Sequence, residues 1–500
     1  MPARGRLFRL AQGLDRTATV FLFLFALAQP LSIAGAQIAY SVAALCWVAR
    51  ISLVRRGILH SSPLDGPILV YWLLCAIATL FSPLPASSWE GMRKISLIFL
   101  VLVVAHSVPH LERVRQLLAV LFLSALSTLA YSSWQYAAGI GLQVVSLDRG
   151  GAAYRAGIRE GAVLFTANGR RLRRPDDLLT VLRTKPPGEV LTLGVVPPGL
   201  EIVVAKDAKP AIIPARELSE PPGAESMGMR VIQERPLRWH GFYSHFVTYS
   251  EEMQLLLALA FGLWLSSRRH LGFPALGFAA LALACALGLG ATLTRSAWLA
   301  AAFACVVQVW FHVRHRWVRL ILPAALILAA LGTNAAMHRW RGVGLIDLQE
   351  GSSEYRLLMW RDGLRLIREH PWFGVGLNTV RDAWQPLDLA AYRLTGIRSH
   401  FHSTPIQIAV ELGLPVLLAW LALLGSYWWM LAKLVRSARD QADTTVYGIS
   451  LGILGGTSGF LLSSLVQYNF GDSVAVLLFW FLMGLALALR RHLEHAPGAG

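Results

Sequence analysis

The sequence predicts a polytopic, all-α membrane protein with about twelve transmembrane helices and a small α/β insertion in an outer loop. Of its 500 residues, 55% are hydrophobic and only 15% are charged, which is too apolar for a soluble protein with a polar surface around its core. Apolar runs recur from Thr17 to the C-terminal tail, and each approaches the roughly 20 residues that a helix needs to cross the hydrocarbon layer. One long interval, from about Tyr136 to His245, is conspicuously polar.

The apolar runs define the predicted spans. They lie at 17–29, 31–48, 67–81, 95–108, 114–134, 246–265, 271–293, 297–313, 320–335, 405–431, 446–466 and 473–489. The basic segment before the first run lacks a convincing cleavage site, so we interpret that run as a retained helix. Only Pro30 separates the first two runs. A single kinked helix is therefore the alternative there, and it would reverse the orientation of everything downstream.

Basic residues indicate the orientation. If the N-terminus is cytoplasmic, every predicted inner segment is basic: Arg4, Arg6, Arg9 and Arg16; Arg50, Arg55 and Arg56; Arg113 and Arg115; Arg268 and Arg269; Arg314, Arg316 and Arg319; Lys433, Arg436 and Arg439; Arg490 and Arg491. The short outer loops are nearly free of such charge, with Arg93 and Lys94 as the main exception. The positive-inside rule therefore favours an even number of spans, two separate helices at the start, and both termini in the cytoplasm.

Charge and cysteine content exclude several classes of protein. The formal net charge of +17 does not indicate nucleic-acid binding, because the basic residues alternate with apolar spans and form no single patch. All four cysteines lie within predicted spans and lack CxxC or CxxH spacing, so neither a zinc site nor a disulfide framework is indicated. We expect no metal and no cofactor.

The first polar outer segment contains a recognisable set of short motifs. These are AAYRAGI at 152–158, Glu160-Gly161, Ala167-Asn168-Gly169, the helix PDDLLTVL at 175–182, and strands at 191–196 and 202–204. Asn168-Gly169 is typical of a tight hairpin turn, and Pro175 suits the first turn of a helix. As a set, the motifs at 138–206 resemble a PDZ domain. HExxH is absent, which argues against an intramembrane metalloprotease with PDZ insertions.

The PDZ resemblance implies a peptide site beside the helix. Such domains take an extended peptide as an added strand, and a Gly-rich loop holds the peptide carboxylate. Gly139, Ile140, Gly141 and Leu142 resemble that loop. Ala162 stands where an acidic residue is usual, and the loop adjoins the end of a predicted span, so a structural or docking role is the alternative to peptide binding.

The second polar outer segment, 337–404, contains EYRLLMWRDGLRLIREHPWFGVGLN and SHFHST. Leu357, Trp360, Leu364 and Ile367 recur at helical spacing and predict one apolar helix face. The helix is expected to end before Pro371.

Four motifs resemble the O-antigen ligase and polymerase superfamily. They are Arg238 with Gly241, Arg295 in TLTRSAWLA, the HPWFGVG segment at 370–376, and His402 before ELGLP at 411–415. Ser403 stands where the family usually has Asn, and Val416 replaces the final glycine of the last motif. The resemblance covers most of the chain outside the PDZ-like segment and implies a GT-C-like glycosyltransferase fold.

The chemistry of that family explains the residue types. Glycosyl transfer from a polyprenyl diphosphate needs fixed positive charge for the leaving group and a base for the acceptor hydroxyl. Arginine pairs with phosphate in a bidentate way, and histidine stays largely neutral near pH 7. The resemblance implies His402, Arg238 and Arg295 as catalytic residues, with Arg235, Arg356, Arg361 and His400 as substrate contacts; His400 competes with His402 for the role of base. No Asp-x-Asp motif is obvious on the outer face, so we expect a metal-independent, inverting reaction.

These expectations divide the chain into five segments: 1–137 with the first five spans, 138–206 with the PDZ-like insert, 207–336 with four spans, 337–404 as the catalytic outer loop, and 405–500 with three spans and a tail. The resemblance implies an enzyme of the bacterial inner membrane with its active site on the periplasmic face. Its expected substrates are an undecaprenyl-diphosphate-linked glycan and a lipid A-core acceptor, and the PDZ-like insert implies a protein partner.

Three alternative functions stay open. A Wzy-like polymerase would use a lipid-linked glycan as the acceptor, and a protein O-oligosaccharyltransferase would use a Ser or Thr of a protein. A transporter or flippase with a docking domain is disfavoured, because the predicted spans contain few midplane charges.

Overall fold

The computed structural model describes residues 2–53, 61–186, 188–198, 208–218, 223–267, 273–341, 351–382, 387–395 and 399–495. They form two compact units. The helical unit comprises Met1–Leu126 and Val247–Gly500, and the insert unit comprises Ser127–Phe246. Arg268 and Arg269, which belong to one predicted inner loop, lie outside the described residues.

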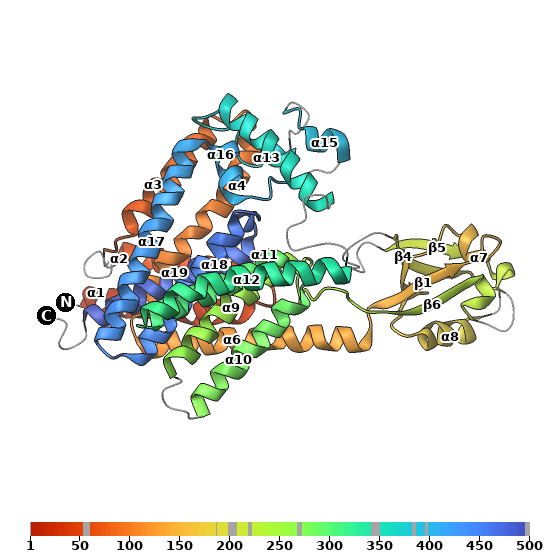
Figure 1. Ribbon diagram of the computed structural model, residues 1–500, viewed down its shortest axis with the longest axis horizontal. Helices are drawn as coiled ribbons and strands as arrows, with labels where there is room; N and C mark the ends of the chain where they lie inside the picture. Colours follow the sequence, from red (N-terminus) through yellow and green to blue (C-terminus); the bar gives the residue numbers. More distant parts are fainter. Residues whose placement is uncertain are drawn as a thin grey trace. The chain divides into compact units, whose positions relative to one another are not determined.

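Helices make up the regular structure of the helical unit (Figure 1). They are α1 (Pro2–Ala28), α2 (Ile33–Leu53), α3 (Asp65–Leu80), α4 (Pro85–Ile95), α5 (Leu100–Ser107), the first part of α6 (Leu111–Ala138), α9 (Phe246–Ser267), α10 (Phe273–Ala291), α11 (Arg295–His312), α12 (Arg316–Arg341), α13 (Gly351–Glu369), α14 (Thr379–Asp382), α15 (Ala390–Thr395), α16 (Thr404–Leu412), α17 (Leu414–Asp440), α18 (Thr444–Ser464) and α19 (Ser473–Glu494).

Among the described residues, seven helices are long and apolar enough to cross a membrane: α1 from Arg9, α2, α6, α10, α17, α18 and α19. Helix α3 is apolar but has only 16 residues. The span predicted at 405–431 is divided at Gly413 into α16 and α17, and the span predicted at 95–108 is divided between a short 3-10 turn and α5. The multi-pass helical class is confirmed, and the number twelve stays a prediction.

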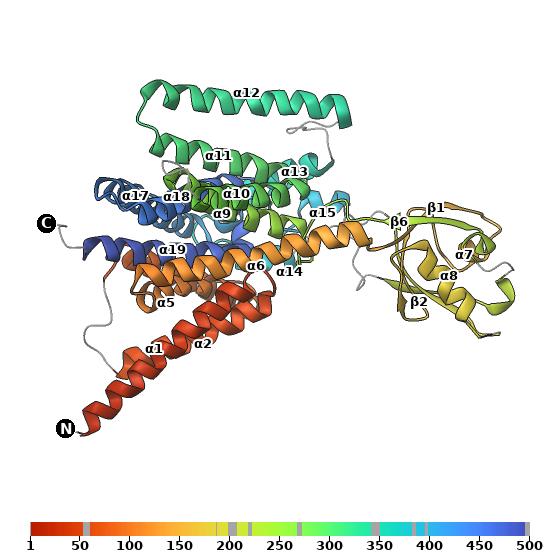
Figure 2. The same cartoon turned by 90° about the horizontal axis from the view of Figure 1, so that it is seen from below.

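The first two helices pack against each other as an antiparallel hairpin (Figure 2). Asp15 and Arg50 form an ion pair across the hairpin, far from its turn. At the turn, the Ser32 N–H donates to the Ala28 carbonyl at 2.7 Å. Two separate helices are thus present, and the alternative of one kinked helix is wrong.

Several predicted inner segments meet at one end of the helical unit. The Arg439 guanidinium donates to the Phe311 carbonyl at 3.0 Å, which joins the ends of α17 and α11. The Arg491 guanidinium donates to the Val108 carbonyl at 3.3 Å, which joins the ends of α19 and α5. Each contact connects segments that the basic-residue pattern assigns to the same side of the membrane.

The predicted outer segments meet at the opposite end. Gln29, at the end of α1, donates through Nε2 to the Val474 carbonyl at the start of α19, at 3.1 Å. Lys94 Nζ in α4 lies 3.5 Å from the Gly471 carbonyl. The structure therefore sorts these loops as the positive-inside pattern does, while the side that faces the cytoplasm stays a prediction.

Small residues let α18 approach its neighbours closely. A Cβ on Gly452 would lie 2.7 Å from the Leu259 Cα in α9, and a Cβ on Gly459 would lie 2.4 Å from the Ala300 carbonyl oxygen in α11. Close backbone approach at small residues is a usual way for membrane helices to associate. Helix α18 is therefore buried between α9 and α11 at the centre of the unit.

The insert unit holds the end of α6 and an antiparallel sheet (Figure 1). Its elements are β1 (Gly141–Leu147), α7 (Ala152–Arg155), β2 (Val163–Ala167), β3 (Arg170–Arg171), α8 (Pro175–Thr184), β4 (Leu191–Val196), β5 (Lys209–Ile213) and β6 (Met229–Glu234). The strand order is β5-β4-β2-β1-β6, and β3 pairs with β2. Leu142, Leu164, Leu178 and Leu193 are buried in the core between the sheet and the helices.

The local predictions for the insert are confirmed. Asn168 and Gly169 have φ of 45° and 75° and connect β2 to β3 as a two-residue hairpin turn. Pro175 starts α8. The predicted strand at 202–204 lies outside the described residues, and the sheet continues beyond the predicted boundary at 206, because β5 pairs with β4 and β6 pairs with β1.

Candidate functional site

The SHFHS segment before α16 is fixed through its central residue. The Phe401 side chain is fully buried in a core formed with α13 and α16. Its N–H donates to Gln407 Oε1 at 2.9 Å, and its carbonyl accepts from Trp360 Nε1 at 2.9 Å. Because both the side chain and the backbone of Phe401 are held, the half-buried histidines on either side of it have defined positions.

His400 and His402 form a pair, with ring centroids 4.3 Å apart. His402 has a φ of 49°, a conformation that few residues other than glycine adopt. Its N–H donates to His400 Nδ1 at 3.1 Å, so that nitrogen of His400 acts as an acceptor. His402 Nε2 lies 3.2 Å from Ser399 Oγ, and the Tyr355 ring meets the His402 ring edge-on at 5.9 Å. Burial raises the pKa of the Tyr355 hydroxyl above its ordinary value, so Tyr355 stays a neutral donor.

Helix α13 buries only part of the apolar face that we predicted. Leu357 and Leu364 are exposed, at 44% and 51%, whereas Met359 and Leu366 are buried. Asp362 lies on the same buried face and accepts from the N–H of Ala391 at 3.2 Å, at the start of α15. Trp360 and Ile367 of the predicted face are partly buried, and Ile367 packs against the core around Phe401. The apolar pattern was therefore right for these two residues only, because a buried carboxylate that caps another helix resembles a solvent-exposed position in sequence.

The HPWFGVG and ELGLP motifs bind each other through their backbones. The Gly376 N–H donates to the Glu411 carbonyl at 2.9 Å, and the Leu414 N–H donates to the Pro371 carbonyl at 2.8 Å. Gly374 has a φ of 66°, and a Cβ there would lie 2.4 Å from the Glu411 carbonyl carbon. The glycines of these motifs therefore serve close packing between the end of α13 and the α16–α17 joint.

Gln467 joins the helix start that carries Arg295 to the one that follows His402. Its side-chain amide donates to Ser296 Oγ at 3.2 Å, and its backbone carbonyl accepts from the Thr404 N–H at 3.1 Å. Arg295 and Ser296 begin α11, and Thr404 begins α16. Two helix N-termini, each with a positive partial charge, thus lie on either side of one glutamine.

Arg238 and Arg235 lie in the insert unit, on the segment from β6 to α9. The Arg238 guanidinium lies 4.2 Å from the Phe246 ring centroid, and that of Arg235 lies 5.4 Å from the Tyr136 ring centroid at the end of α6. The structure describes the two units separately, so joint action of Arg238 with the helical-unit residues stays a prediction.

His240 holds the turn that follows Arg238. Its Nδ1–H donates to the Tyr243 carbonyl at 2.6 Å, and the Gly241 N–H donates to Ser132 Oγ on α6 at 3.1 Å. Burial lowers the pKa of the His240 imidazole below its ordinary value. A structural role for His240 follows, as a neutral donor in a buried turn.

The remaining two predicted substrate arginines lie on α13 at different depths. Arg356 is half-buried and follows Tyr355, which contacts His402. Arg361 is exposed. Arg361 follows Trp360, which donates to the Phe401 carbonyl between the two histidines. Both arginines thus adjoin residues that contact the SHFHS segment, and their contact with substrate stays a prediction.

The sheet gives no free edge at the predicted peptide site. Gly141 and Leu142 belong to β1, which pairs with β2 on one side and β6 on the other, and the Ile140 N–H donates to the Glu234 carbonyl at 2.9 Å. A strand that is paired on both sides has no free edge for a further strand, so β1 itself does not take an added peptide strand; a role of Gly139–Leu142 in holding a peptide carboxylate stays a prediction. Within the described residues the outer strand on this side is β6, which lies beside α8.

Four polar residues at the outer end belong to none of the predicted sites: Glu251, Thr404, Gln467 and Asn469. Each lies in or beside an apolar run, where a polar side chain must find a partner. That signal was present for Glu251, which with Glu252 interrupts the predicted span at 246–265 and is fully buried in α9.

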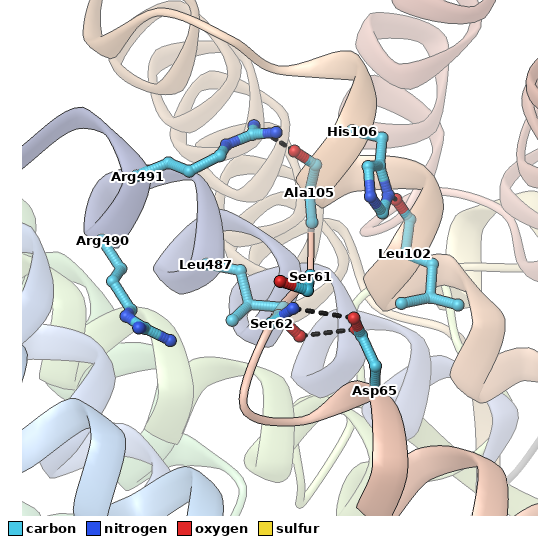
Figure 3. Close-up of a pocket in the computed structure, with 9 residues that line it drawn as sticks. All are labelled: Ser61, Ser62, Asp65, Leu102, Ala105, His106, Leu487, Arg490 and Arg491. Atoms are coloured by element: carbon cyan, nitrogen blue, oxygen red, sulfur yellow. Dashed lines mark hydrogen bonds between the residues drawn. The ribbon is translucent and has the colours of Figure 1, made fainter. Parts of the chain in front are cut away.

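A polar cavity at the predicted inner end has a structural explanation (Figure 3). It measures about 20 Å³, room for about one water molecule. Asp65 accepts from the Ser62 N–H at 2.7 Å at the start of α3, and Arg491 donates to the Ala105 carbonyl near the end of α5 (Figure 3). These polar groups are thus used at helix ends.

The fold and the outer-end cluster define a multi-pass helical membrane protein with a PDZ-like insert. Residues 278–421 match the O-antigen ligase family, and residues 143–197 match the PDZ domain. The predicted resemblance to both is thereby confirmed, and the first match supports a glycosyltransferase-like activity in polysaccharide processing. A comparison with curated proteins gave no match.

Proposed function

We propose that this protein is an O-antigen ligase-type glycosyltransferase, which moves a preassembled glycan from undecaprenyl diphosphate to a lipid A-core acceptor at the outer face of the bacterial inner membrane. The link through Gln467 carries the proposal, because it ties the arginine at the start of α11 to the histidine pair before α16. Displacement of a diphosphate needs an anion-binding group and a base in fixed relation.

Arg295 binds the diphosphate of the donor. Its planar guanidinium pairs with two phosphate oxygens at once and stays protonated as the leaving group gains charge. The N-termini of α11 and α16 add positive partial charge on the same side. Arg238 and Arg235 add further cationic contacts, and Arg356 and Arg361 contact the glycan.

His402 acts as the base. The oxygen of the acceptor hydroxyl attacks the anomeric carbon, its proton passes to His402, and the bond from that carbon to the diphosphate oxygen breaks with inversion of configuration. His400 orients the base, because its Nδ1 accepts a hydrogen bond from the His402 backbone N–H and so holds the His402 backbone in its left-handed conformation. The reaction uses no metal ion.

The acceptor distinguishes this function from its closest rivals. A polymerase would elongate a second lipid-linked glycan, and a protein O-oligosaccharyltransferase would modify a Ser or Thr. The PDZ-like insert favours a protein partner, because domains of this kind take up extended peptides.

The test uses purified protein with a defined undecaprenyl-diphosphate glycan and three acceptors: lipid A-core, a second lipid-linked glycan, and a Ser/Thr peptide. We expect transfer to lipid A-core. His402→Ala should lower transfer on the order of 100-fold to 10,000-fold while donor binding is retained, because only proton transfer is lost. Arg295→Ala and Arg238→Ala should also weaken donor binding.

Two matched variants sharpen this test. His400→Ala should leave more transfer activity than His402→Ala. Arg295→Lys should bind the donor more weakly than the wild type, because lysine keeps the charge but loses the bidentate geometry. A dead His400→Ala beside an active His402→Ala would exchange the two histidine roles. Full activity in both would end the histidine-base mechanism, and transfer only to another acceptor would end the ligase assignment.

A further inference from the structure

Helix α9 carries a buried carboxylate with a defined set of contacts. Glu251 is 1% exposed and lies two helical turns or less from the start of α9. Its Oε2 accepts from Ser463 Oγ in α18 at 2.9 Å, and its Oε1 has no hydrogen-bond partner within the described part of the chain. A carboxylate inside a membrane protein is costly, so its partners point to a role.

The contacts of Ser463 continue toward α16. Ser463 Oγ accepts from Asn469 Nδ2 at 3.0 Å, and Asn469 Oδ1 accepts from Thr404 Oγ1 at 3.1 Å. These contacts connect Thr404 to Glu251 through Asn469 and Ser463. The Ser463 hydroxyl also lies within hydrogen-bond distance of the Phe460 carbonyl, at 3.0 Å, and the Thr404 hydroxyl also lies 3.0 Å from the Gln467 backbone carbonyl. Neighbouring hydrogen bonds in such a chain polarise one another.

The chain ends at the residue that fixes the histidine segment. Thr404 is the first residue of α16 and follows His402 by two positions. Its N–H donates to the Gln467 backbone carbonyl at 3.1 Å, its hydroxyl oxygen lies 3.0 Å from the same carbonyl oxygen, and the Gln467 side chain continues to Ser296 beside Arg295. Three hydrogen bonds thus connect Glu251 to the start of α16.

We infer that Glu251 is a positioning residue, which through Ser463, Asn469 and Thr404 holds the start of α16 and so the orientation of His400 and His402. The inference rests on the proposed function only for its effect on transfer. Glu251 belongs to none of the four motifs, and it acts through other groups without touching substrate. Its acceptor oxygen is the property that matters, because the chain delivers a hydrogen to it.

The experiment compares Glu251→Ala, Glu251→Gln, Ser463→Ala and the Glu251→Ala/Ser463→Ala double variant. Ser464→Ala is the matched control, because Ser464 Oγ donates only within its own helix, to the Leu461 carbonyl at 2.6 Å. The first readout needs no substrate: the rate at which diethyl pyrocarbonate modifies His400 and His402 in the folded protein, followed by mass spectrometry. The second readout is the kcat and KM of transfer.

Glu251→Ala and Ser463→Ala should each change the modification rate by about threefold or more, and the double variant should add nothing further, because both break one chain. Transfer should fall about 10-fold to 100-fold in kcat, with the KM for donor nearly unchanged. Glu251→Gln should regain much of the loss, since its amide oxygen accepts the same bond. Ser464→Ala should behave as the wild type.

Unchanged modification in both folded single variants, or losses that multiply in the double variant, would overturn the positioning role. If Glu251→Ala fails to fold, Ser463→Ala decides the same question. Coupled modification rates in a protein that transfers no glycan would uphold positioning and overturn the proposed function, so the two failures are distinguishable.

Discussion

Phe401 lies between His400 and His402 and fixes the position of both, because its ring is buried and its backbone N–H and carbonyl are both hydrogen-bonded. The close contact of α13 with Phe401 and α16 depends on Gly363, where a Cβ would lie 3.1 Å from Phe401 Cδ1 and 2.6 Å from Ile406 Cγ2. The functional candidates are thus held by residues that carry no chemistry themselves. Substitutions in this supporting set should affect activity without removing a reacting group.

Gly374→Ala should destabilise the helical unit. The residue has a φ of 66°, and the added Cβ would meet the backbone of Glu411 at 2.4 Å, where no flexible side chain can yield. We expect a loss of several kcal/mol, within the range of about 1–5 kcal/mol for strain and overpacking together, visible as a lower Tm in detergent.

Gly425→Ala is the control for that substitution, because Gly425 lies in α17 and an added Cβ there would meet nothing within 4 Å. It should leave the Tm unchanged or raise it slightly, since alanine favours a helix over glycine. An equal fall in Tm for both variants would contradict the close-packing argument.

The stability of the turn at His240 should depend on pH. Burial lowers the pKa of His240 in the fold, so as pH falls the unfolded state takes up a proton before the folded state does, and folding stability decreases. Hydrogen exchange of the 239–245 segment, corrected for the intrinsic effect of pH, should show weaker protection at about pH 5 than at about pH 8. His240→Asn retains a donor for the Tyr243 carbonyl but does not titrate, so its protection should vary less with pH; equal variation would contradict the assignment.

The sequence predicted the candidate reactive residues better than the residues that hydrogen-bond around them in the fold. Arg295 and the SHFHS histidines were found from motifs, because their residue types match the chemistry. Gln467 and Asn469 were not, because the contacts that make them relevant are to residues more than 60 positions away in sequence. Such pairings depend on helix packing, which no local pattern encodes.

Among the secondary-structure elements, the apolar periodicity predicted that a helix is present but did not always predict which of its faces is buried. Helix α13 was predicted, yet its buried face includes Asp362 and excludes Leu357, because Asp362 caps α15 and the helix packs beside the SHFHS segment. For the PDZ-like insert, local signals found β2, β3, β4 and α8. They did not reveal that β1 would gain β6 as a partner from more than 80 residues further along the chain.

That pairing makes a prediction about excision. The ends of the insert lie together, because Gln233 Nε2 donates to the Ala138 carbonyl at 2.8 Å. Replacing residues 139–234 by a short flexible linker should leave a folded, monodisperse helical unit, whereas deletion of 141–205 removes β1 and β4 and leaves β5 and β6 without the strands that they pair with. Size-exclusion chromatography in detergent should show aggregation or proteolysis of the second protein only; equal behaviour of the two would contradict the extended boundary.

The excised protein also separates the roles of the two units. If the insert serves docking, the 139–234 deletion should transfer glycan to a simple acceptor at saturating substrate and lose only its partner dependence or acceptor choice. Complete loss of transfer in a stable protein would make the insert part of the catalytic architecture.

For the whole molecule, the positive-inside rule predicts which loops lie on the same side of the membrane. Segments that the arginine pattern assigns to the cytoplasm contact each other at one end of the helical unit, as Arg439 with Phe311 and Arg491 with Val108 do. The candidate site residues of that unit lie at the other end, where Gln467 bonds to Ser296 and Thr404. Charge and packing, which are independent, thus agree on which loops share a side.

Single cysteines introduced into a variant that lacks Cys46, Cys75, Cys285 and Cys305 test which side that is. Cysteine at Arg170 in the insert and at Arg361 on exposed α13 should react in intact cells with a maleimide that crosses the outer membrane but not the inner one. Cysteine at Arg436 should react only after the inner membrane is opened, because basic loops are retained in the cytoplasm. Arg436 serves as the matched internal control, since it lies near the end of α17 and its guanidinium is 5.8 Å from the Phe311 ring at the end of α11. Reversed labelling of Arg361 and Arg436 would place the histidine pair in the cytoplasm, where an outward-facing lipid-linked glycan cannot reach it, and would end the proposed function together with the predicted topology.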